Sequence, residues 1–456
     1  MAVQRILSKR DLLVRRIRKL LHQENFKELK LLLKATPPEE IADIFSYLSE
    51  DDIQHIFILL PTDKAGIVLN ETDNTSEHYL LKQVDDSRLA TILSRLPDDE
   101  AVDILSKLDA ERSEAVLARV KEDEGIRQLM HFPSDTAGGI MSTQYIAVKY
   151  SATVKGALTS IRNFKADDPD LYHIIYVVDE HGHLMGGITL ARLLKATPSC
   201  RLSRIYRRNP VRVQFMVDQE EVARLVSLYN LVNIPVVDES NKLIGVVYVE
   251  DVIDVITEEA TEDIYKIAGI NEPKGSDRTV YQYSRLRLPW LLITMMGSII
   301  GALILTQFST KLGKLLTGIL FTFNPLIAAM SGNAGVQSSS IVIRGLATGE
   351  VSPLNVWRII FREFRVGLIT GLVCGLLVGG LIALLWQTSI NVTSLALTLG
   401  LAMCSGMTLA ATLGALIPVL LNRIGTDPAV ATGPFVTTLN DITGMSIYIL
   451  IATSLI

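Results

Sequence analysis

Four long stretches with almost no charge, all in the C-terminal part, constrain the fold of this chain more than any other feature. They are Leu288–Thr310, Leu315–Ile343, Val366–Asn422 and Pro428–Ile456, and Asp441 is the only charged residue inside them. A helix needs about 20 mostly apolar residues to cross a bilayer. The third stretch is too long for one crossing, and the polar segment Trp386–Ser394 divides it. The sequence therefore predicts five transmembrane helices.

The basic residues around these helices predict their orientation. Seven arginines fall on the side of the N-terminus: Arg285, Arg287, Arg344, Arg358, Arg362, Arg365 and Arg423. Two lysines, Lys311 and Lys314, fall on the other side. Because cytoplasmic loops are enriched in Lys and Arg, we expect an integral protein of the plasma (inner) membrane, with the N-terminus in the cytoplasm and the C-terminus outside.

Charge divides the chain into two unlike parts. Residues 1–273 carry a net charge of −11, whereas the residues from 274 onward carry +6. The three cysteines (Cys200, Cys374 and Cys404) are scattered, which does not suit a disulfide framework. We expect membrane lipid and no nucleic acid as a partner. We also expect no enzyme activity, because the sequence has no nucleophile–base constellation and no phosphate-binding glycine loop.

Asp441 lies near the middle of the last predicted helix, where an acid is costly unless it meets water or a partner. Gly433, Thr437 and Asp441 recur at helical spacing and share a face, and Asn440 is adjacent. In the second helix Asn333 and Gln337 also share a face. Small and polar residues often only join membrane helices. However, no predicted span offers Asp441 a basic partner, so we interpret these residues as an ion pathway.

The ligands of this pathway indicate which cation it carries. One carboxylate with amide, hydroxyl and carbonyl oxygens, and no His or Cys nearby, is a set of hard ligands that suits Mg²⁺, Ca²⁺ or Mn²⁺. Mg²⁺ keeps its water and accepts one or two carboxylates, whereas dehydrated Ca²⁺ needs more. The residues favour Mg²⁺ modestly.

Two internal repeats organise the soluble part. Residues 36–120 repeat a polar start, acids and then apolar residues at helical spacing, which predicts short helices stacked as a superhelix. Farther on, Ile174–Leu194 matches Asn233–Ile253, and each copy predicts strand, turn, strand and helix. This second repeat resembles a tandem pair of CBS domains, which often bind adenosine nucleotides. Nucleotide-binding CBS motifs tend to have an acid at one position, where the second copy has Asp251 but the first copy has Arg192. ATP is therefore a candidate ligand of this pair.

A run of six acids without a base follows the second repeat. It comprises Asp251, Asp254, Glu258, Glu259, Glu262 and Asp263. Like charges one turn apart destabilise a helix slightly. Such a run is either a solvated face or a strut that responds to cations, and the sequence favours neither.

Three motifs accompany this order of parts: SDTAGGIM at 134–141, GNAGVQS at 332–338 and GPFVTTLNDITG at 433–444. The motifs and the order together resemble the MgtE family of magnesium channels or transporters over nearly the whole chain. The resemblance implies a homodimer whose pore lies on the two-fold axis. It also implies that Asp441 of both subunits holds a hydrated Mg²⁺, with Thr437 and Gly433 on the same face.

The resemblance further implies that cytosolic Mg²⁺ closes the pore by binding to acids. Those that match are Asp251, Asp254, Glu259, Glu262 and Asp263, with Asp99 and Asp103 as partners from the N-terminal domain. Three positions depart from the family pattern: Asn230 replaces an acid, Ser331 replaces a glycine, and Gly433 replaces an asparagine of some relatives.

We therefore expect an α-helical integral membrane protein with five transmembrane helices, a cytosolic all-α superhelical domain and an α/β tandem CBS domain. The expected boundaries are a basic extension at 1–25, the acidic superhelix at 26–132, the CBS pair at 133–256, a connecting helix and linker at 257–284, and the pore domain at 285–456. Two alternatives to a channel stay open: a carrier that exchanges Mg²⁺ or another divalent cation for Na⁺ or H⁺, and a membrane-anchored sensor.

Overall fold

The chain divides into two compact units, one ending at Glu258 and the other beginning at Glu259. A computed structural model describes residues 2–121, 123–164, 170–208, 210–270, 280–309, 314–348, 350–351, 355–385, 392–431 and 433–455. Residues 271–279 of the expected linker and 386–391 of the expected polar turn lie outside the described residues.

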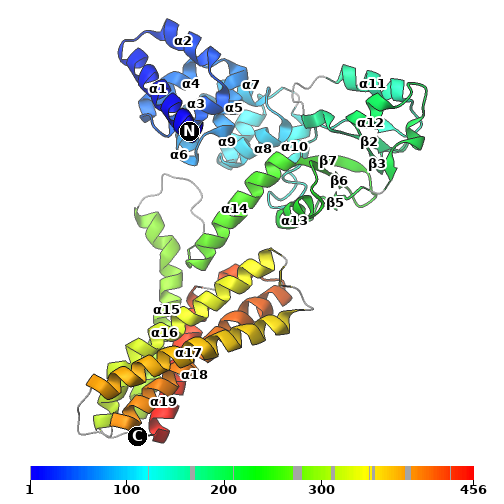
Figure 1. Ribbon diagram of the computed structural model, residues 1–456. Helices are drawn as coiled ribbons and strands as arrows, with labels where there is room; N and C mark the ends of the chain where they lie inside the picture. Colours follow the sequence, from blue (N-terminus) through cyan, green and yellow to red (C-terminus); the bar gives the residue numbers. More distant parts are fainter. Residues whose placement is uncertain are drawn as a thin grey trace. The chain divides into compact units, whose positions relative to one another are not determined.

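The first unit begins with short helices joined by tight turns (Figure 1). They are α1 (Ala2–His22), α2 (Phe26–Ala35), α3 (Pro38–Phe45), α4 (Glu50–Leu59), α5 (Thr62–Glu71), α6 (Asn74–Gln83), α7 (Asp86–Leu93), α8 (Asp98–Ser106), α9 (Ala110–Leu117) and α10 (Glu124–Leu129). The sequence repeat corresponds to α3, α4, α5, α7 and α8. Side-chain caps explain several starts: Ser49, for example, accepts from the backbone N–H of Asp52. The predicted series of short helices is confirmed.

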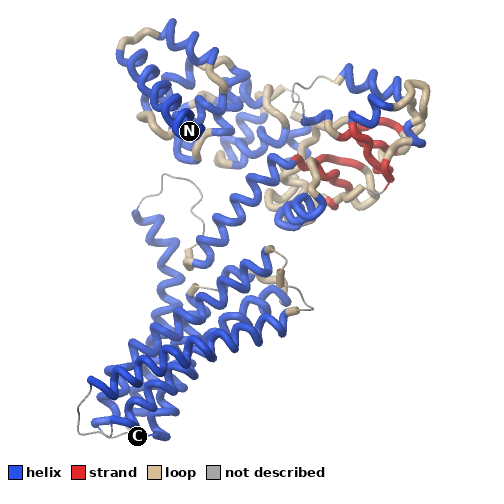
Figure 2. The backbone as a smooth tube through the Cα atoms, in the orientation of Figure 1, coloured by secondary structure: helices blue, strands red, loops and turns tan. Residues whose placement is uncertain are grey.

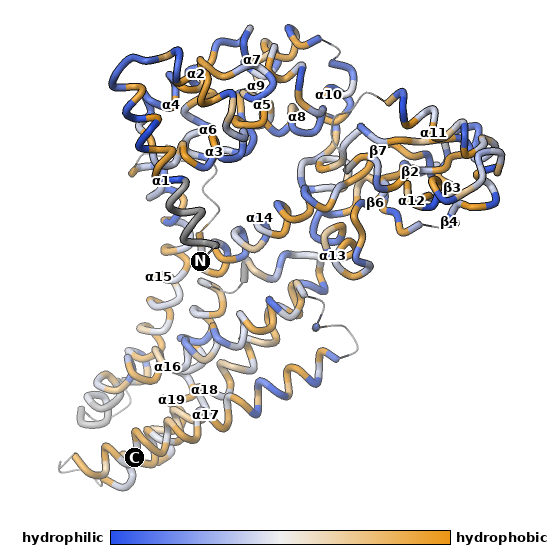
Figure 3. The backbone as a smooth tube through the Cα atoms, turned by 45° about the horizontal axis from the view of Figure 1, so that its top comes forward, coloured by the Kyte–Doolittle hydropathy of each residue, from blue (hydrophilic) through white to orange (hydrophobic). Residues whose placement is uncertain are grey.

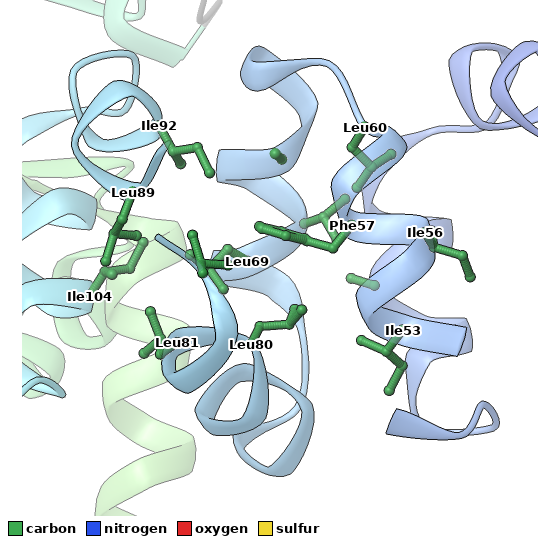
Figure 4. Packing of buried hydrophobic residues seen from close by; sticks show 14 of the residues in the cluster. Ile53, Ile56, Phe57, Leu60, Leu69, Leu80, Leu81, Leu89, Ile92 and Ile104 are labelled. Atoms are coloured by element: carbon green, nitrogen blue, oxygen red, sulfur yellow. The ribbon is translucent and has the colours of Figure 1, made fainter. Parts of the chain in front are cut away.

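One apolar core runs through these helices. Ile53, Phe57, Leu69, Leu80 and Ile92 all point inward from successive helices and are 0–3% exposed (Figure 4). The basic helix α1 contributes to the same core, because Val14, Ile17 and Leu20 on its apolar side are buried there. Its apolar face therefore packs within the domain.

An ion pair between the buried Glu77 and the partly exposed Lys107 stabilises the same domain. Glu77 is 3% exposed and accepts two hydrogen bonds from the Nζ atom of Lys107, at 2.8 and 2.9 Å. Burial raises the pKa of Glu77, and the Lys107 ammonium opposes that shift.

We expect Lys107→Met to lower the free energy of unfolding by roughly 2 kcal/mol, less than for a fully buried pair because water reaches Lys107. Thermal unfolding followed by circular dichroism measures the loss. The exposed Lys121→Met is the control, and equal shifts in both variants would contradict the prediction.

Two small sheets follow, one for each copy of the second repeat (Figure 2). The first contains β1 (Ala147–Lys149), β2 (Ile174–Val178), β3 (Leu184–Thr189) and β4 (Arg207–Arg208), with helices α11 (Val154–Asn163) and α12 (Leu190–Lys195). The second contains β5 (Val213–Gln214), β6 (Asn233–Val237) and β7 (Leu243–Tyr248), with helices α13 (Gln219–Tyr229) and α14 (Val249–Ile267). Both antiparallel hairpins shift register near the end of their first strand, at Val177/Val178 and Val236/Val237. The predicted duplication is confirmed.

A buried hydrogen bond ties the two copies together. The Tyr176 hydroxyl donates to Oδ1 of Asn233 at 2.8 Å, and the two residues are 2% and 3% exposed. Helix α14 then runs unbroken from Val249 to Ile267, across the expected boundary at residue 257. The final helix of the second copy and the connecting helix are therefore one continuous helix.

The described residues of the second unit form five long helices in which apolar residues predominate (Figure 3). They are α15 (Val280–Ser309), α16 (Lys314–Ala347), α17 (Val356–Leu385), α18 (Val392–Arg423) and α19 (Pro434–Leu455). All five are long and apolar enough to span a membrane, which confirms the predicted number. Helix α18 packs against α16, α17 and α19, and α15 packs against α19.

Helix α17 begins at Val356, well before the uncharged stretch that starts at Val366. The early part contains Glu363, which is 3% exposed. Its carboxylate accepts from the Oγ atom of Ser338 at 3.0 Å and from the Nε atom of Arg362 at 3.1 Å. Because both oxygens have partners, the buried acid is tolerated there.

Candidate ion pathway and regulatory acids

Asp441 lies about two turns beyond the start of α19, on a polar face. The hydroxyl of Thr437 donates to the carbonyl oxygen of Gly433 at 2.7 Å. A side chain of the first turn of α19 therefore satisfies a backbone acceptor at the start of the helix. Asp441 is half-buried, and among the described residues it has neither an ion pair nor a hydrogen bond. The acid on which the sequence interpretation depends is thus unneutralised within one chain.

Asn333 and Gln337 lie one turn apart on α16, and both are exposed in the single chain. The other side of this helix is buried, because Ser338 and Ser339 are 3% and 0% exposed. Helix α16 packs directly against α19. The candidate pathway residues on α16 therefore occupy the side that one chain leaves open.

Asn440 takes a different direction from Asp441. Its side chain is 0% exposed and packs against Gly335 of α16, near the carbonyl oxygen of Ala410. The structure therefore places Asn440 inside the helix bundle of one chain, whereas Asn333, Gln337 and Asp441 all retain exposed surface.

A first group of acids lies within the first unit, where α8 meets the start of α14. We call it the α8–α14 acid group, and it comprises Asp99, Glu100, Asp103, Glu250 and Asp251. Burial and the neighbouring Asp99 raise the pKa of Asp251 to about 8 and the pKa of Glu100 to about 7. The carboxylates thus repel one another, as expected for acids buried side by side. At Asp103 the nearby Lys107 ammonium opposes the rise in pKa.

Neighbouring polar groups hold part of this group in place. Ser142 donates to Oδ1 of Asp99 at 3.0 Å, and the backbone N–H of Tyr248 donates to Oδ2 of Asp251 at 3.2 Å. Farther along α14, Glu258 acts electrostatically on Asp103, and Asp254 acts on Glu71. The structure therefore places Asp251 near Asp99 and Asp103, and Asp254 near Glu71.

Three acids of this region were missed by sequence reasoning: Glu71, Glu100 and Glu250. Glu100 lies beside Asp99 in LPDDEAVDIL, and Glu250 lies beside Asp251, so adjacency could have indicated both. Glu71 comes from a separate helix, and no local pattern marks it.

A second group lies within the second unit, at the end of α14. The Nζ atom of Lys266 is 2.6 Å from carboxylate oxygens of both Glu262 and Asp427. Burial opposes charge on Lys266, but these two carboxylates outweigh it and raise its pKa. Burial and Asp427 together raise the pKa of Asp263. Lys266 and Asp427 were both missed, because the chain between them is long and carries no pattern that pairs them.

A bound metal ion would require several of these side chains to converge. Within the described ranges, no three His, Cys, Asp or Glu side chains converge closely enough to hold a metal ion. Glu259 is half-buried on α14. The acids suit Mg²⁺ by their chemistry, since it prefers oxygen ligands and binds through few carboxylates and retained water. Their role as metal ligands stays a prediction.

Comparison with known proteins assigns each part of the chain. Residues 324–451 match the MgtE family, described as divalent cation transporters, residues 36–135 match the MgtE intracellular N domain, and residues 137–199 and 202–258 match CBS domains. A protein named magnesium transporter MgtE from Bacillus subtilis is 32% identical over 99% of this chain and 96% of its own length. The chain belongs to the MgtE family. It is an integral membrane protein of that family, with a CBS pair and five membrane helices.

Other MgtE relatives agree with this assignment. The magnesium transporter MgtE of Enterococcus faecalis is 33% identical over 95% of both chains, and that of Thermus thermophilus is 36% identical over 73% of this chain and 72% of its own. A crystal structure of the cytosolic domain of the Mg²⁺ channel MgtE in complex with ATP covers 52% of this chain and 98% of its own, at 32% identity and a TM-score of 0.50. The predicted family and fold class are confirmed.

Proposed function

We propose that this MgtE protein is a Mg²⁺ channel whose ion pathway is formed by α19 and α16. The observation that carries the proposal is Asp441, a half-buried acid in a membrane helix without an ionic partner among the described residues. An acid in such a place needs a cation or water. The MgtE relatives named as magnesium transporters support Mg²⁺ as that cation.

A single chain supplies one carboxylate at this depth, so a homodimer would supply two. Hydrated Mg²⁺ would lie between the two copies of Asp441, with Thr437 and Gly433 on the same face and Asn333 and Gln337 from α16 nearby. Asp441 would attract the ion, and the amide and hydroxyl groups would hydrogen-bond its water. The membrane lipid around the dimer and the cytoplasmic N-terminus are part of the same proposal.

Cytosolic Mg²⁺ would close this channel through the acids of α14. Asp251, Asp254 and Glu259 would bind Mg²⁺ against Asp99 and Asp103, which removes the repulsion between α14 and the N-terminal domain. Glu262 and Asp263 would act at the other end of the helix, where Lys266 already neutralises Glu262 and Asp427. The ion shifts this equilibrium only by its greater affinity for the closed state.

ATP is a second candidate ligand of the CBS pair. The support is the ATP complex of the related cytosolic domain. Asp251 already accepts a backbone hydrogen bond in this chain, and Arg192 is exposed on α12.

Mg²⁺ uptake into proteoliposomes tests the proposal. Full-length protein should load a Mg²⁺ indicator inside the vesicles, whereas empty vesicles and vesicles with heat-denatured protein should not. Uptake that requires a Na⁺ or H⁺ gradient would instead support the carrier. Absence of Mg²⁺ uptake by folded protein would overturn both.

Protons should replace Mg²⁺ in part at the α8–α14 acid group. The pKa of Asp251 rises from 3.8 to about 8 in the compact arrangement, so the compact state is favoured at low pH and loses that advantage as pH rises toward about 8. Without divalent cations, the linker around residues 265–280 should resist protease better at pH 6 than at pH 8.5. The same change in Asp251→Asn protein would show that another group titrates.

A further inference from the structure

Helices α16, α18 and α19 enclose two polar side chains where they meet. Asn440 of α19 and Ser331 of α16 are each 0% exposed. The Oδ1 and Nδ2 atoms of Asn440 and the Oγ atom of Ser331 have no hydrogen-bond partner among the described residues. An unpaired polar group inside a membrane protein is costly, and each such group calls for an explanation.

Glycines make the room for both side chains. A methyl group added at Gly335 would overlap the Nδ2 atom of Asn440 and would lie 3.3 Å from the carbonyl oxygen of Ala410. The Ser331 side chain sits in the same way, because a methyl group at Gly406 would lie 2.7 Å from its Oγ atom. In each case one polar side chain fills the space that a neighbouring glycine leaves open.

The contact of Asn440 with Gly335 and a contact of Ser331 with Gly444 form successive layers between α16 and α19. Ser331 and Gly335 are four residues apart on α16, and Asn440 and Gly444 are four apart on α19. A methyl group at Gly444 would lie 3.4 Å from the Oγ atom of Ser331. Because residues four apart lie above one another on a helix, the interface holds α19 against α16 at two levels.

Seating Asn440 in this interface fixes the direction of the next residue. Neighbouring residues on an α-helix point about 100° apart. With Asn440 fully enclosed, Asp441 is turned away from the Gly335 contact and remains half-buried. A rotation that removed Asn440 from its place would turn Asp441 by the same angle.

We propose that Asn440 is a positioning residue, whose carboxamide, seated against Gly335, sets the rotation of α19 and thereby points Asp441 into the ion pathway. The proposal rests on the proposed function of Asp441. The contact is steric, since neither polar atom of the carboxamide is paired. Only Gly at 335 leaves room for it.

A compensating pair of substitutions tests this contact. Gly335→Ala should push α19 outward and lower Mg²⁺ uptake about tenfold, and Asn440→Ala should lower it several-fold by freeing the helix. In the double variant the new methyl group occupies the space of the missing carboxamide, so uptake should recover to within about threefold of the parent. Gly380→Ala, where a methyl group meets open space, is the matched control.

A second readout follows the rotation of α19 without ion flux. The substitution Thr437→Cys is made in protein whose three native cysteines are replaced. The rate at which a water-soluble thiol reagent modifies the new cysteine reports how accessible the Asp441 face is. Each single variant should change this rate, and the double variant should restore it. If the rate follows this pattern but no variant transports Mg²⁺, the proposed function fails and the positioning contact stands.

Additivity would overturn the inference. If the double variant loses as much uptake as the product of the two single losses, and its thiol rate is no closer to the parent, then Asn440 and Gly335 do not position Asp441. If Gly335→Ala alone does not fold, recovery of folded protein in the double variant supports the contact, and failure to recover it overturns the contact.

Discussion

Asp441→Asn is expected to reduce Mg²⁺ flux about 100-fold or more while the protein still folds, since each 1.4 kcal/mol of lost attraction is a factor of ten. The substitution keeps the size of the side chain and removes its charge. At an effective dielectric of 20, one charge acts on another about 4 Å away with roughly 4 kcal/mol. When both carboxylates around a divalent ion are neutralised, the lost attraction is several times larger. The water shell of the ion reduces this loss, because it lengthens the distance between the ion and the carboxylates.

Two controls separate charge from structure in this experiment. Asp441→Glu keeps the charge and should retain more flux than Asp441→Asn. Glu350→Gln removes an exposed acid from the same unit and should leave flux unchanged. Normal flux in folded Asp441→Asn protein would show that Asp441 is not the pore ligand.

Neutralising Asp251, Asp254 and Glu259 together is expected to raise the Mg²⁺ concentration needed for closure by about tenfold or more, the effect of losing 1.4 kcal/mol of binding. The substitutions remove ligands from α14, whereas Asp99 and Asp103 still repel the remaining acids. Conduction at low Mg²⁺ should persist, because the ion pathway is untouched. Removing repulsion could instead favour closure, but loss of the ligands removes the attraction on which closure depends.

Protease protection of the linker around residues 265–280 across a Mg²⁺ titration measures this shift. A triple variant of exposed acids elsewhere in the first unit, Glu111→Gln, Glu124→Gln and Glu239→Gln, matches the change in net charge. An equal midpoint in the two triple variants would mean that the acids of α14 are a solvated face.

Periodic features of the fold could be predicted from the sequence, because they depend on local patterns. The short helices α3, α4, α5, α7 and α8 follow from a polar start and apolar spacing, and the two hairpins follow from a duplicated strand pattern. The five membrane helices follow from length and hydropathy alone. Each of these features depends on a pattern of residues within a single segment of the chain.

Contacts between distant segments could not be predicted in the same way. Glu363 lies just before the uncharged stretch that starts at Val366, and no local pattern indicates that Ser338 on another helix donates to its carboxylate. Asn440 shares a polar segment with Asp441, yet its side chain is buried against Gly335 on another helix. The pairing of Lys266 with Asp427 likewise needs the folded second unit. These features depend on tertiary packing, which periodicity does not encode.

Electrical recording from excised membrane patches tests the central claim most directly, with Mg²⁺ as the only permeant cation and its concentration on the cytoplasmic face under control. We expect unitary Mg²⁺ currents that disappear as cytoplasmic Mg²⁺ rises and that are lost in Asp441→Asn protein. Mg²⁺ transport without unitary currents, or currents that cytoplasmic Mg²⁺ leaves unchanged, would contradict a channel closed by its own ion.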